Sequence, residues 1–393
     1  MDKFDLELDE TVLRSRRGNK WHLHPPDVLP AFVAEMDLRV APCIHAAVER
    51  IVREQDYGYP QRTDESADRE VATAFARHMK RRFGWETAPQ LALPVADLVQ
   101  GTYASLLAFS DPGDGVILQV PNYPPFREAI VSTQRRLLSL PMRDTGTRYA
   151  FDMAELKQLV DRGTRIFVLC NPQNPTGRVF SRDELLAIGR FALEHELTIV
   201  SDEIHSDLVY APRHHIPIAS LSPEIAARTI TLNSATKSYN IPGLRCGVIH
   251  FGTEELAARY HKRIPARLTG QCGVTGIDAT VAAWDGGQPW LDAVMEHLRR
   301  ARDRAVSVLG AELPAIKLYE PEATYLLWLN CSDLGLSQSA FEFFLNNAKV
   351  GLSEGERFEP TSTQFVRLNF ATSFSILDQI LERMIAAVRR NQR

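Results

Sequence analysis

The sequence lacks the cysteine spacing that a disulfide framework or a structural zinc site would need. Its five cysteines are odd in number and scattered, and no two of them form a Cys-x-x-Cys pair. Free thiols are typical of a reducing compartment, so we expect a cytoplasmic protein. His214-His215 and the pair His22 and His24 have no cysteine or acidic residue at metal-ligand spacing. We therefore expect solvated loop histidines there and no metal site.

Long apolar runs and a strong charge of one sign are also missing. No uninterrupted apolar run approaches the roughly 20 residues that a membrane helix needs, and the acidic segment Met1–Asp5 does not resemble a secretory signal. The net charge of −4, from interspersed basic and acidic residues, gives no reason to expect nucleic acid or an anionic membrane as a partner. The 393 residues, 45% of them hydrophobic, suffice for one large domain and a smaller one.

The middle of the chain alternates short apolar runs with longer amphipathic segments. Short β-branched runs that end at turn residues predict strands buried on both faces. These predicted strands are Val116–Val120, Arg165–Cys170, Leu197–Val200, Thr229–Leu232 and Gly247–Phe251. The segments between them have helical periodicity, and Ser181 followed by Glu184 is a capping box. This alternation predicts an α/β domain with a mostly parallel sheet.

The two ends of the chain have a different pattern. An irregular, proline-rich segment leads to a predicted helix at Pro42–Gln55. Beyond Gly287 the sequence predicts a long helix at Trp290–Leu309, strands at Tyr325–Leu329 and Phe365–Phe370, and a last helix at Ile376–Arg389. We expect residues 1–50 and 289–393 to form one small α+β domain together, and residues 51–288 to form the large domain.

Four polar motifs lie in or just after predicted strands. Ligands gather at the carboxyl ends of strands in open α/β sheets, so the four can meet in one crevice. The first is Asn171-Pro172-Gln173-Asn174-Pro175-Thr176-Gly177, a rigid turn that could also be a tight loop without function. The second is Ser201-Asp202-Glu203-Ile204-His205, in which the acid after the strand could be only a helix cap.

The other two motifs place basic residues in unusual surroundings. In Ser234–Arg245, Lys237 stands between small hydroxyl residues just after a buried strand, although lysine is mostly a solvated residue. In Arg367-Leu368-Asn369-Phe370, Arg367 lies inside an otherwise apolar strand. Taken alone, Arg367 is explained equally well by a surface ion pair.

Together the four motifs resemble the fold-type-I pyridoxal 5′-phosphate (PLP) enzymes of the class I/II aminotransferase superfamily. The order Asn-Pro-Thr-Gly, Asp, Ser-x-x-Lys and a C-terminal Arg matches that family, and so do the gaps between the motifs. The segments that resemble its cystathionine β-lyase and cysteine-S-conjugate β-lyase branch are Val33–Leu38, Asp202–Leu208, Lys237–Gly243 and Pro289–Asp292. The resemblance implies a seven-stranded sheet in a large PLP-binding domain formed by residues 51–288.

The resemblance also implies which residues contact the reactive part of PLP. Lys237 would hold it as a Schiff base, which requires a neutral amine and hence a lowered pKa. Asp202 would balance the protonated ring nitrogen, Asn174 and His205 would contact the phenolate oxygen, and Tyr123 would stack on the ring. Lys237, Asp202 and Tyr123 are therefore the expected catalytic residues.

The remaining contacts to the cofactor and the substrate follow from the same resemblance. A phosphate needs the N–H groups of a helix start, cations and hydroxyls. The residues implied are Gly101, Thr102 and Tyr103 at a helix start, with Ser234 and Arg245. Tyr59 of a neighbouring subunit, or Tyr57 in its place, would also reach the phosphate, so we expect a homodimer with shared active sites. Arg367 would hold the α-carboxylate of an amino-acid substrate in a two-pronged pair beside Asn174.

The function that the resemblance favours is a PLP-dependent carbon–sulfur β-lyase. It would cleave an S-substituted L-cysteine, cystathionine-like or larger, to a thiol, pyruvate and ammonia. The alternative is an aminotransferase or a decarboxylating oxidative deaminase, because the early steps are shared and Arg245 fits the transaminase pattern Gly-Leu-Arg-x-Gly. A PLP-binding regulatory protein is the third alternative, and the presence of Lys237 argues against it. The segment Thr269–Val274 departs from the usual lyase pattern and predicts an unusual substrate.

Overall fold

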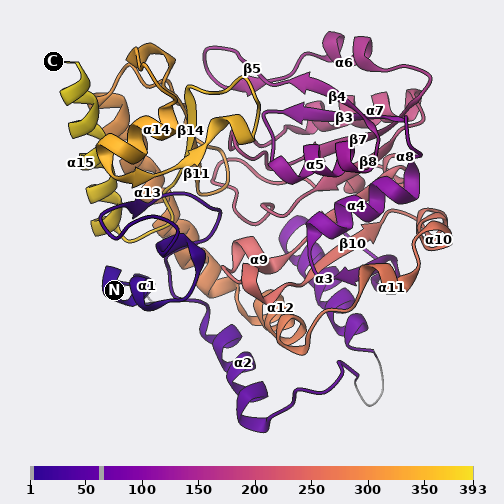
Figure 1. The fold of residues 1–393 in the computed structure, drawn as a ribbon. Coiled ribbons are helices and arrows are strands. Elements are labelled where there is room, and N and C mark those ends of the chain that lie inside the picture. The colour runs from indigo at the N-terminus through magenta and orange to yellow at the C-terminus, as the bar shows by residue number, and fades with distance from the viewer. Residues whose placement is uncertain (1–3, 62–65, 393) are drawn as a thin grey trace.

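A seven-stranded sheet lies at the centre of the larger part of the computed structural model, which describes residues 4–61 and 66–392 (Figure 1). The strand order is β2-β10-β9-β8-β7-β3-β4. The strands are β2 Ala92–Val95, β3 Gly115–Val120, β4 Arg136–Pro141, β7 Thr164–Cys170, β8 Thr198–Asp202, β9 Thr229–Asn233 and β10 Gly247–Phe251. Strand β10 alone runs opposite to the other six strands. The predicted α/β fold with a mostly parallel sheet is confirmed.

Helices cover both faces of this sheet, which explains why the central strands are almost continuously apolar. On one face Val116 and Leu118 of β3 pack with residues of α4 Leu98–Phe109, α5 Pro124–Ser132 and α10 Glu254–Arg263. On the other face Ile117 packs with residues of α6 Met153–Leu159, α7 Arg182–Glu194 and α8 Pro223–Ala226. The predicted capping box of Ser181 and Glu184 begins α7.

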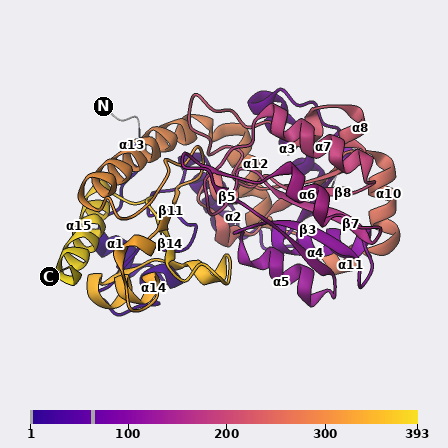
Figure 2. The same cartoon turned by 90° about the horizontal axis from the view of Figure 1, so that it is seen from above.

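The two ends of the chain meet in the smaller part of the molecule (Figures 1 and 2). The N-terminal strand β1 Leu29–Pro30 pairs in parallel with β12 Val350–Gly351. The other elements of this part are α1 Glu10–Ser15, α14 Ala340–Phe343, α15 Phe374–Asn391 and the antiparallel strands β11 Leu326–Asn330, β13 Ser353–Glu354 and β14 Phe365–Asn369. The long helix α13 Gln288–Glu312 runs from the sheet-bearing part into the smaller part (Figure 2).

The helix α2 Pro42–Glu54 differs from its expected place in the small domain. It packs on α12 Val274–Gly286, and α12 in turn packs on α3 Ala67–Phe83. The chain has therefore already joined the larger part before residue 50. The domain limits at residues 50 and 288 stay a prediction, because packing alone does not define independent domains.

The strand directions bring the loops after β2, β3, β7 and β8 and the connection from β9 to β10 to one edge of the sheet. Strands β3, β7, β8 and β9 run parallel, so their carboxyl ends lie together. Strand β2 ends at the same edge and β10 begins there, because β10 is antiparallel to both β2 and β9. Three of the four predicted motifs lie at the ends of β7, β8 and β9, and Tyr123 follows β3, so the topology places them side by side. The fourth motif, with Arg367, lies in β14 of the smaller part.

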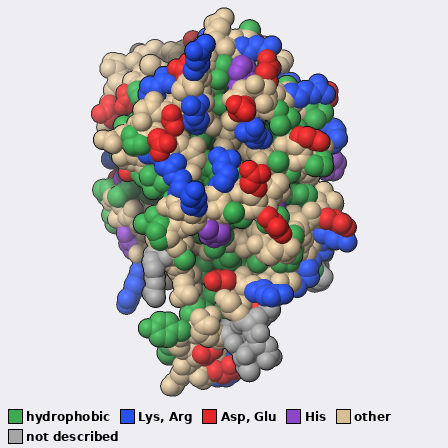
Figure 3. All heavy atoms as spheres, turned by 90° about the vertical axis from the view of Figure 1, so that its right-hand side faces the viewer, with side chains coloured by type: hydrophobic (Ala, Val, Ile, Leu, Met, Phe, Trp, Pro, Cys, Tyr) green, Lys and Arg blue, Asp and Glu red, His purple; other side chains and the backbone are tan. Residues whose placement is uncertain are grey.

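Charged side chains of both signs are interspersed on the face shown in Figure 3. Among the helices in the part of the chain that the structure describes, none combines the length and the apolar character that crossing a bilayer requires.

Candidate active site

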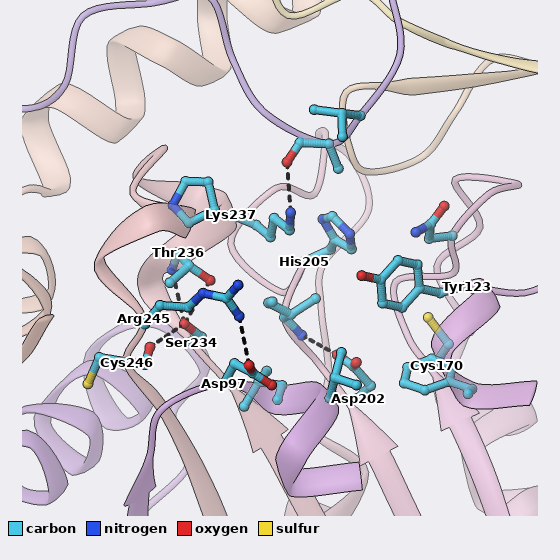
Figure 4. A pocket seen from close by; sticks show the side chains of 18 of the residues that line it. Asp97, Tyr123, Cys170, Asp202, His205, Ser234, Thr236, Lys237, Arg245 and Cys246 are labelled. Carbon is cyan, nitrogen blue, oxygen red and sulfur yellow. Dashed lines mark hydrogen bonds and ion pairs between the residues drawn. The ribbon is translucent and has the colours of Figure 1, made fainter. Parts of the chain in front are cut away.

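One cavity of about 300 Å³ lies at this edge of the sheet (Figure 4). Eight of the predicted site residues line it: Tyr123, Asn174, Asp202, His205, Ser234, Lys237, Arg245 and Arg367. They come from six different segments of the chain. The topology therefore brings together the residues that the sequence resemblance grouped, whereas their individual roles stay predictions.

Lys237 lies in the short helix α9 Ala235–Ser238, just after β9. Its Nζ donates a hydrogen bond to the carbonyl oxygen of Ala34 at 2.7 Å. Burial, together with the positive charge of Arg367, lowers the pKa of Lys237 to about 8. The neutral amine, which a nucleophile or a base requires, is therefore far more populated near neutral pH than in a solvated lysine.

Asp202 is the last residue of β8 and is buried. Its Oδ1 accepts the N–H of Ile204 at 3.0 Å (Figure 4). Burial raises the pKa of Asp202 to about 7 despite this hydrogen bond. A carboxylate in this position gains strongly from a cationic partner, and a protonated ring nitrogen supplies one.

Arg367 is buried in β14 without an acidic partner among the described residues. Its Nη1 donates to Oδ1 of Asn174 at 2.8 Å, and its Nη2 donates to Oγ of Ser353 at 3.1 Å. Its guanidinium carbon lies 4.7 Å from the centre of the Phe358 ring, and burial lowers its pKa to about 10. A buried guanidinium held only by neutral groups is well suited to binding a carboxylate.

His205 and Tyr123 face the cavity from two other loops (Figure 4). Burial lowers the pKa of His205 to about 3, so its imidazole is neutral. Tyr123 is the N-cap of α5 and meets the Phe126 ring edge-on, with 5.7 Å between the ring centres. Burial raises the pKa of Tyr123, so this phenol also stays neutral.

The end of the cavity near α4 differs from the prediction. Gly101 and Thr102 are buried within α4, and the hydroxyl of Tyr103 accepts a hydrogen bond from Ser132. None of these three residues lines the cavity; residues 96–99 do. The helix begins three residues before Gly101, because Asp97 caps it by accepting the N–H of Gln100. An aspartate just before an apolar run is the signal that could have located this helix start.

Three further residues complete that end of the cavity. The Oγ of Ser234 donates to the carbonyl oxygen of Cys246 at 2.6 Å and is 2.9 Å from Oγ1 of Thr236. Thr236 lines the cavity and was not among the predicted residues. Nη1 of Arg245 donates to Oδ2 of Asp97 at 2.7 Å (Figure 4).

Three further residues for which the sequence made a prediction, Tyr59, Tyr57 and His215, do not line the cavity. Tyr59 and Tyr57 lie on the segment after α2 that leaves the body of the chain, with 88% and 66% of their surfaces exposed (Figure 1). They are therefore free to contact another subunit.

The expectation of a solvated His215 is wrong, because His215 is buried and its Nε2 lies 2.8 Å from Oε2 of Glu203. Residue types and spacing do not reveal that Glu203 is buried beside His215.

The polar groups of the cavity match the parts of PLP one by one. The amine of Lys237 suits its carbonyl group, the carboxylate of Asp202 suits its ring nitrogen, and the start of α4 with Arg245 suits its phosphate. The buried Nδ1 of His205 and Nε of Arg367 have no hydrogen-bond partner among the described residues. Buried polar atoms usually have a partner, so these two are consistent with a site that a ligand completes.

Fold and cavity together define a PLP-type transferase or lyase scaffold, and comparison with known sequences gives the family. The model of the aminotransferase class I and II family matches residues 39–384. The chain belongs to this family. The resemblance predicted from the four motifs is confirmed.

Individual relatives cover nearly the whole chain. Cystathionine beta-lyase PatB of Bacillus subtilis is 34% identical over 364 residues, which are 92% of this chain and 93% of PatB. The crystal structure of OvoB superposes with a TM-score of 0.91 at 34% identity and covers 98% of this chain and 99% of that one. Cystalysin from Treponema denticola, whose structure contains a pyridoxal 5′-phosphate cofactor, has a TM-score of 0.91 at 26% identity, with 99% of each chain covered.

The first test concerns Asp202. Asp202→Asn keeps the size and the acceptor for the Ile204 N–H but removes the charge. We expect the loaded enzyme to turn over about 100-fold more slowly or worse, because a buried charge at the reacting group is lost. The cofactor-free variant should be at least as stable as wild type at pH 8. The folded-state pKa of Asp202 is raised to about 7, so stability falls as the pH rises from the ordinary carboxyl pKa to about 7. The penalty is fully present at pH 8, and asparagine removes it.

Steady-state kinetics and thermal unfolding measure the two effects. Asp183→Asn, at an exposed position in the first turn of α7, is the control for loss of one carboxylate. Turnover close to wild type in Asp202→Asn would show that Asp202 only caps the turn that follows β8.

Proposed function

We propose that this chain is a PLP-dependent carbon–sulfur β-lyase acting on an S-substituted L-cysteine. The observation that carries the proposal is the convergence of Lys237, Asp202 and Arg367 on one cavity of a family member that is 34% identical to a cystathionine β-lyase. The overall reaction consumes one water and yields the thiol, pyruvate and ammonia. A larger S-linked conjugate is included in the proposed substrate class.

Arg367 orients the substrate. Its guanidinium binds the α-carboxylate, and its bond to Asn174 fixes the direction in which the two-pronged pair is offered. The pair between the guanidinium and the carboxylate would form in the buried cavity, where its hydrogen bonds are stronger than at the surface. This contact presents the Cα–H bond of the substrate to Lys237.

Lys237 moves the proton. Bound PLP withdraws electrons from Cα, which makes the Cα proton acidic. The Nζ of Lys237 takes that proton, since its lowered pKa keeps the amine available as a base. The carbonyl of Ala34 only accepts hydrogen bonds, so it holds one N–H of Lys237 and leaves the lone pair free. Once protonated, the same Nζ is an acid that can return a proton to the departing sulfur.

A homodimer with shared sites forms part of the proposal. The exposed Tyr59, on the segment that follows α2 and does not line the cavity of its own chain, supports it. The tyrosine would add a hydroxyl to the phosphate contacts of the second subunit. The five cysteines are all free thiols, which supports the cytoplasm as the proposed location.

Product analysis separates elimination from amino transfer. With L-cystathionine and other S-substituted cysteines, and without a keto acid, we expect many turnovers that yield equal amounts of thiol, pyruvate and ammonia. A coupled lactate dehydrogenase assay and a thiol reagent measure the products, and Lys237→Ala is the inactive control. Reaction that stops after one equivalent and restarts only with a keto acid would instead identify an aminotransferase. Release of carbon dioxide or consumption of oxygen without thiol would identify the oxidative alternative.

Subunit mixing tests whether Tyr59 acts across the dimer. Lys237→Ala and Tyr59→Ala each damage every site of their own homodimers. In a mixed dimer one site keeps Lys237 from one chain and Tyr59 from the other. If Tyr59 acts across the interface, refolding an equal mixture should restore about a quarter of the wild-type sites, because half of the dimers are mixed and each has one intact site. No recovery above the two parents, or a monomer in light scattering, would contradict shared sites.

A further inference from the structure

Asp97 places a negative charge at the end of the cavity where the phosphate is expected. As the N-cap of α4, it accepts the N–H of Gln100 on Oδ1 at 2.8 Å. Its Oδ2 accepts from Nη1 of Arg245 at 2.7 Å (Figure 4). One carboxylate therefore already engages the two kinds of donor that bind a phosphate, a helix start and a guanidinium.

Arg245 is the cation best placed to bind a phosphate at the end of the cavity near α4. Of the other basic residues that line the cavity, Lys237 bonds to Ala34 and Arg367 bonds to Asn174 and Ser353. The backbone of Arg245 has φ 52°, in the left-handed region that side chains with a Cβ rarely adopt. The turn that carries Arg245 is thus held in an uncommon conformation, directly beside the start of α4.

A phosphate can readily replace Asp97 as the partner of Arg245. The Arg245 side chain is 64% exposed and the Asp97 side chain 34%, so water screens their attraction and the pair contributes little free energy. A phosphate monoester carries a charge of about −1.5 to −2 at pH 7. It would attract Arg245 more strongly than one carboxylate does, and it would be repelled by the carboxylate of Asp97.

We propose that Asp97 weakens cofactor binding by competing with the phosphate for Arg245. In the cofactor-free chain the carboxylate caps α4 and pairs with Arg245; when PLP enters, it gives up Arg245 and opposes the new negative charge. Asp97 thereby makes the cofactor exchangeable. The inference rests on the proposed function only in taking PLP as the cofactor.

Asp97→Asn isolates the charge, because asparagine caps helices as well as aspartate does and keeps the acceptor for Gln100. We expect its cofactor-free form to bind PLP about threefold to tenfold more tightly than wild type, the range set by one partly exposed charge. The holoenzyme should release PLP correspondingly more slowly. Equilibrium titration of the visible absorbance of bound PLP gives the dissociation constant, and transfer of PLP to a scavenger gives the release rate.

Two controls make the result specific. Asp152→Asn changes the same residue type at the N-cap of α6, where Asp152 accepts the N–H of Ala154, and should leave PLP binding unchanged. Pyridoxal, which lacks the phosphate, should bind wild type and Asp97→Asn equally. Asp97→Ser, which also caps a helix without a charge, should repeat the gain and guards against a folding defect in one variant.

Tighter binding of PLP but not of pyridoxal supports the proposal. Equal or weaker binding of PLP by Asp97→Asn and Asp97→Ser, or the same gain for pyridoxal, overturns it while the lyase proposal stands. Failure of the wild-type chain to bind PLP at all would reject the proposed function itself, and this inference with it.

Discussion

Burial of three ionisable side chains around one cavity is the constraint on which the site depends. Burial favours the neutral form of each: it raises the pKa of Asp202 to about 7 and lowers the pKa values of Lys237 and Arg367 to about 8 and 10. None of the three forms an ion pair within the described residues. The charges that would satisfy them must therefore come from ligands, and a protonated ring nitrogen and a substrate carboxylate are of the required signs. Binding of these ligands would therefore stabilise the charged forms of the buried side chains and shift their pKa values.

The fold meets this constraint by placing each group on rigid backbone. Asp202 ends a central strand and Arg367 lies within another, so their main chains cannot move away from the cavity. The loop 33–37 across the cavity is held as firmly: Asn369 donates to the carbonyl oxygens of Val33 and Glu35, both at 2.7 Å. Val33 has φ 57°, a strained conformation for a β-branched residue, which persists only because such contacts over-determine it. This loop presents the Ala34 carbonyl to Lys237.

The sequence predicted the parts of the fold in which local pattern and tertiary burial agree. The central strands β3, β7, β8, β9 and β10 are apolar on both faces and were found from that pattern. Strands β2 and β4 were missed, because they lie at the sheet edges and are only partly buried, so their sequences lack a continuous apolar run. The four motifs located most of the cavity, since three of them lie at strand ends on one edge of the sheet and the fourth carries Arg367 within β14. Asp97 is not predicted, because the resemblance places the helix start at Gly101. The Ala34 carbonyl is not predicted either, because a backbone acceptor leaves no trace in residue type.

The central claim is that Lys237 carries the cofactor covalently, and reduction with borohydride tests it most directly. The purified protein incubated with PLP should absorb visible light, and borohydride should remove that band and fix the cofactor to the chain. Peptide mass spectrometry should then find the added pyridoxyl phosphate mass on Lys237 alone, and Lys237→Ala should show neither band nor added mass. A protein that stays colourless with PLP, or a label on surface lysines with Lys237 unmodified, would contradict the account.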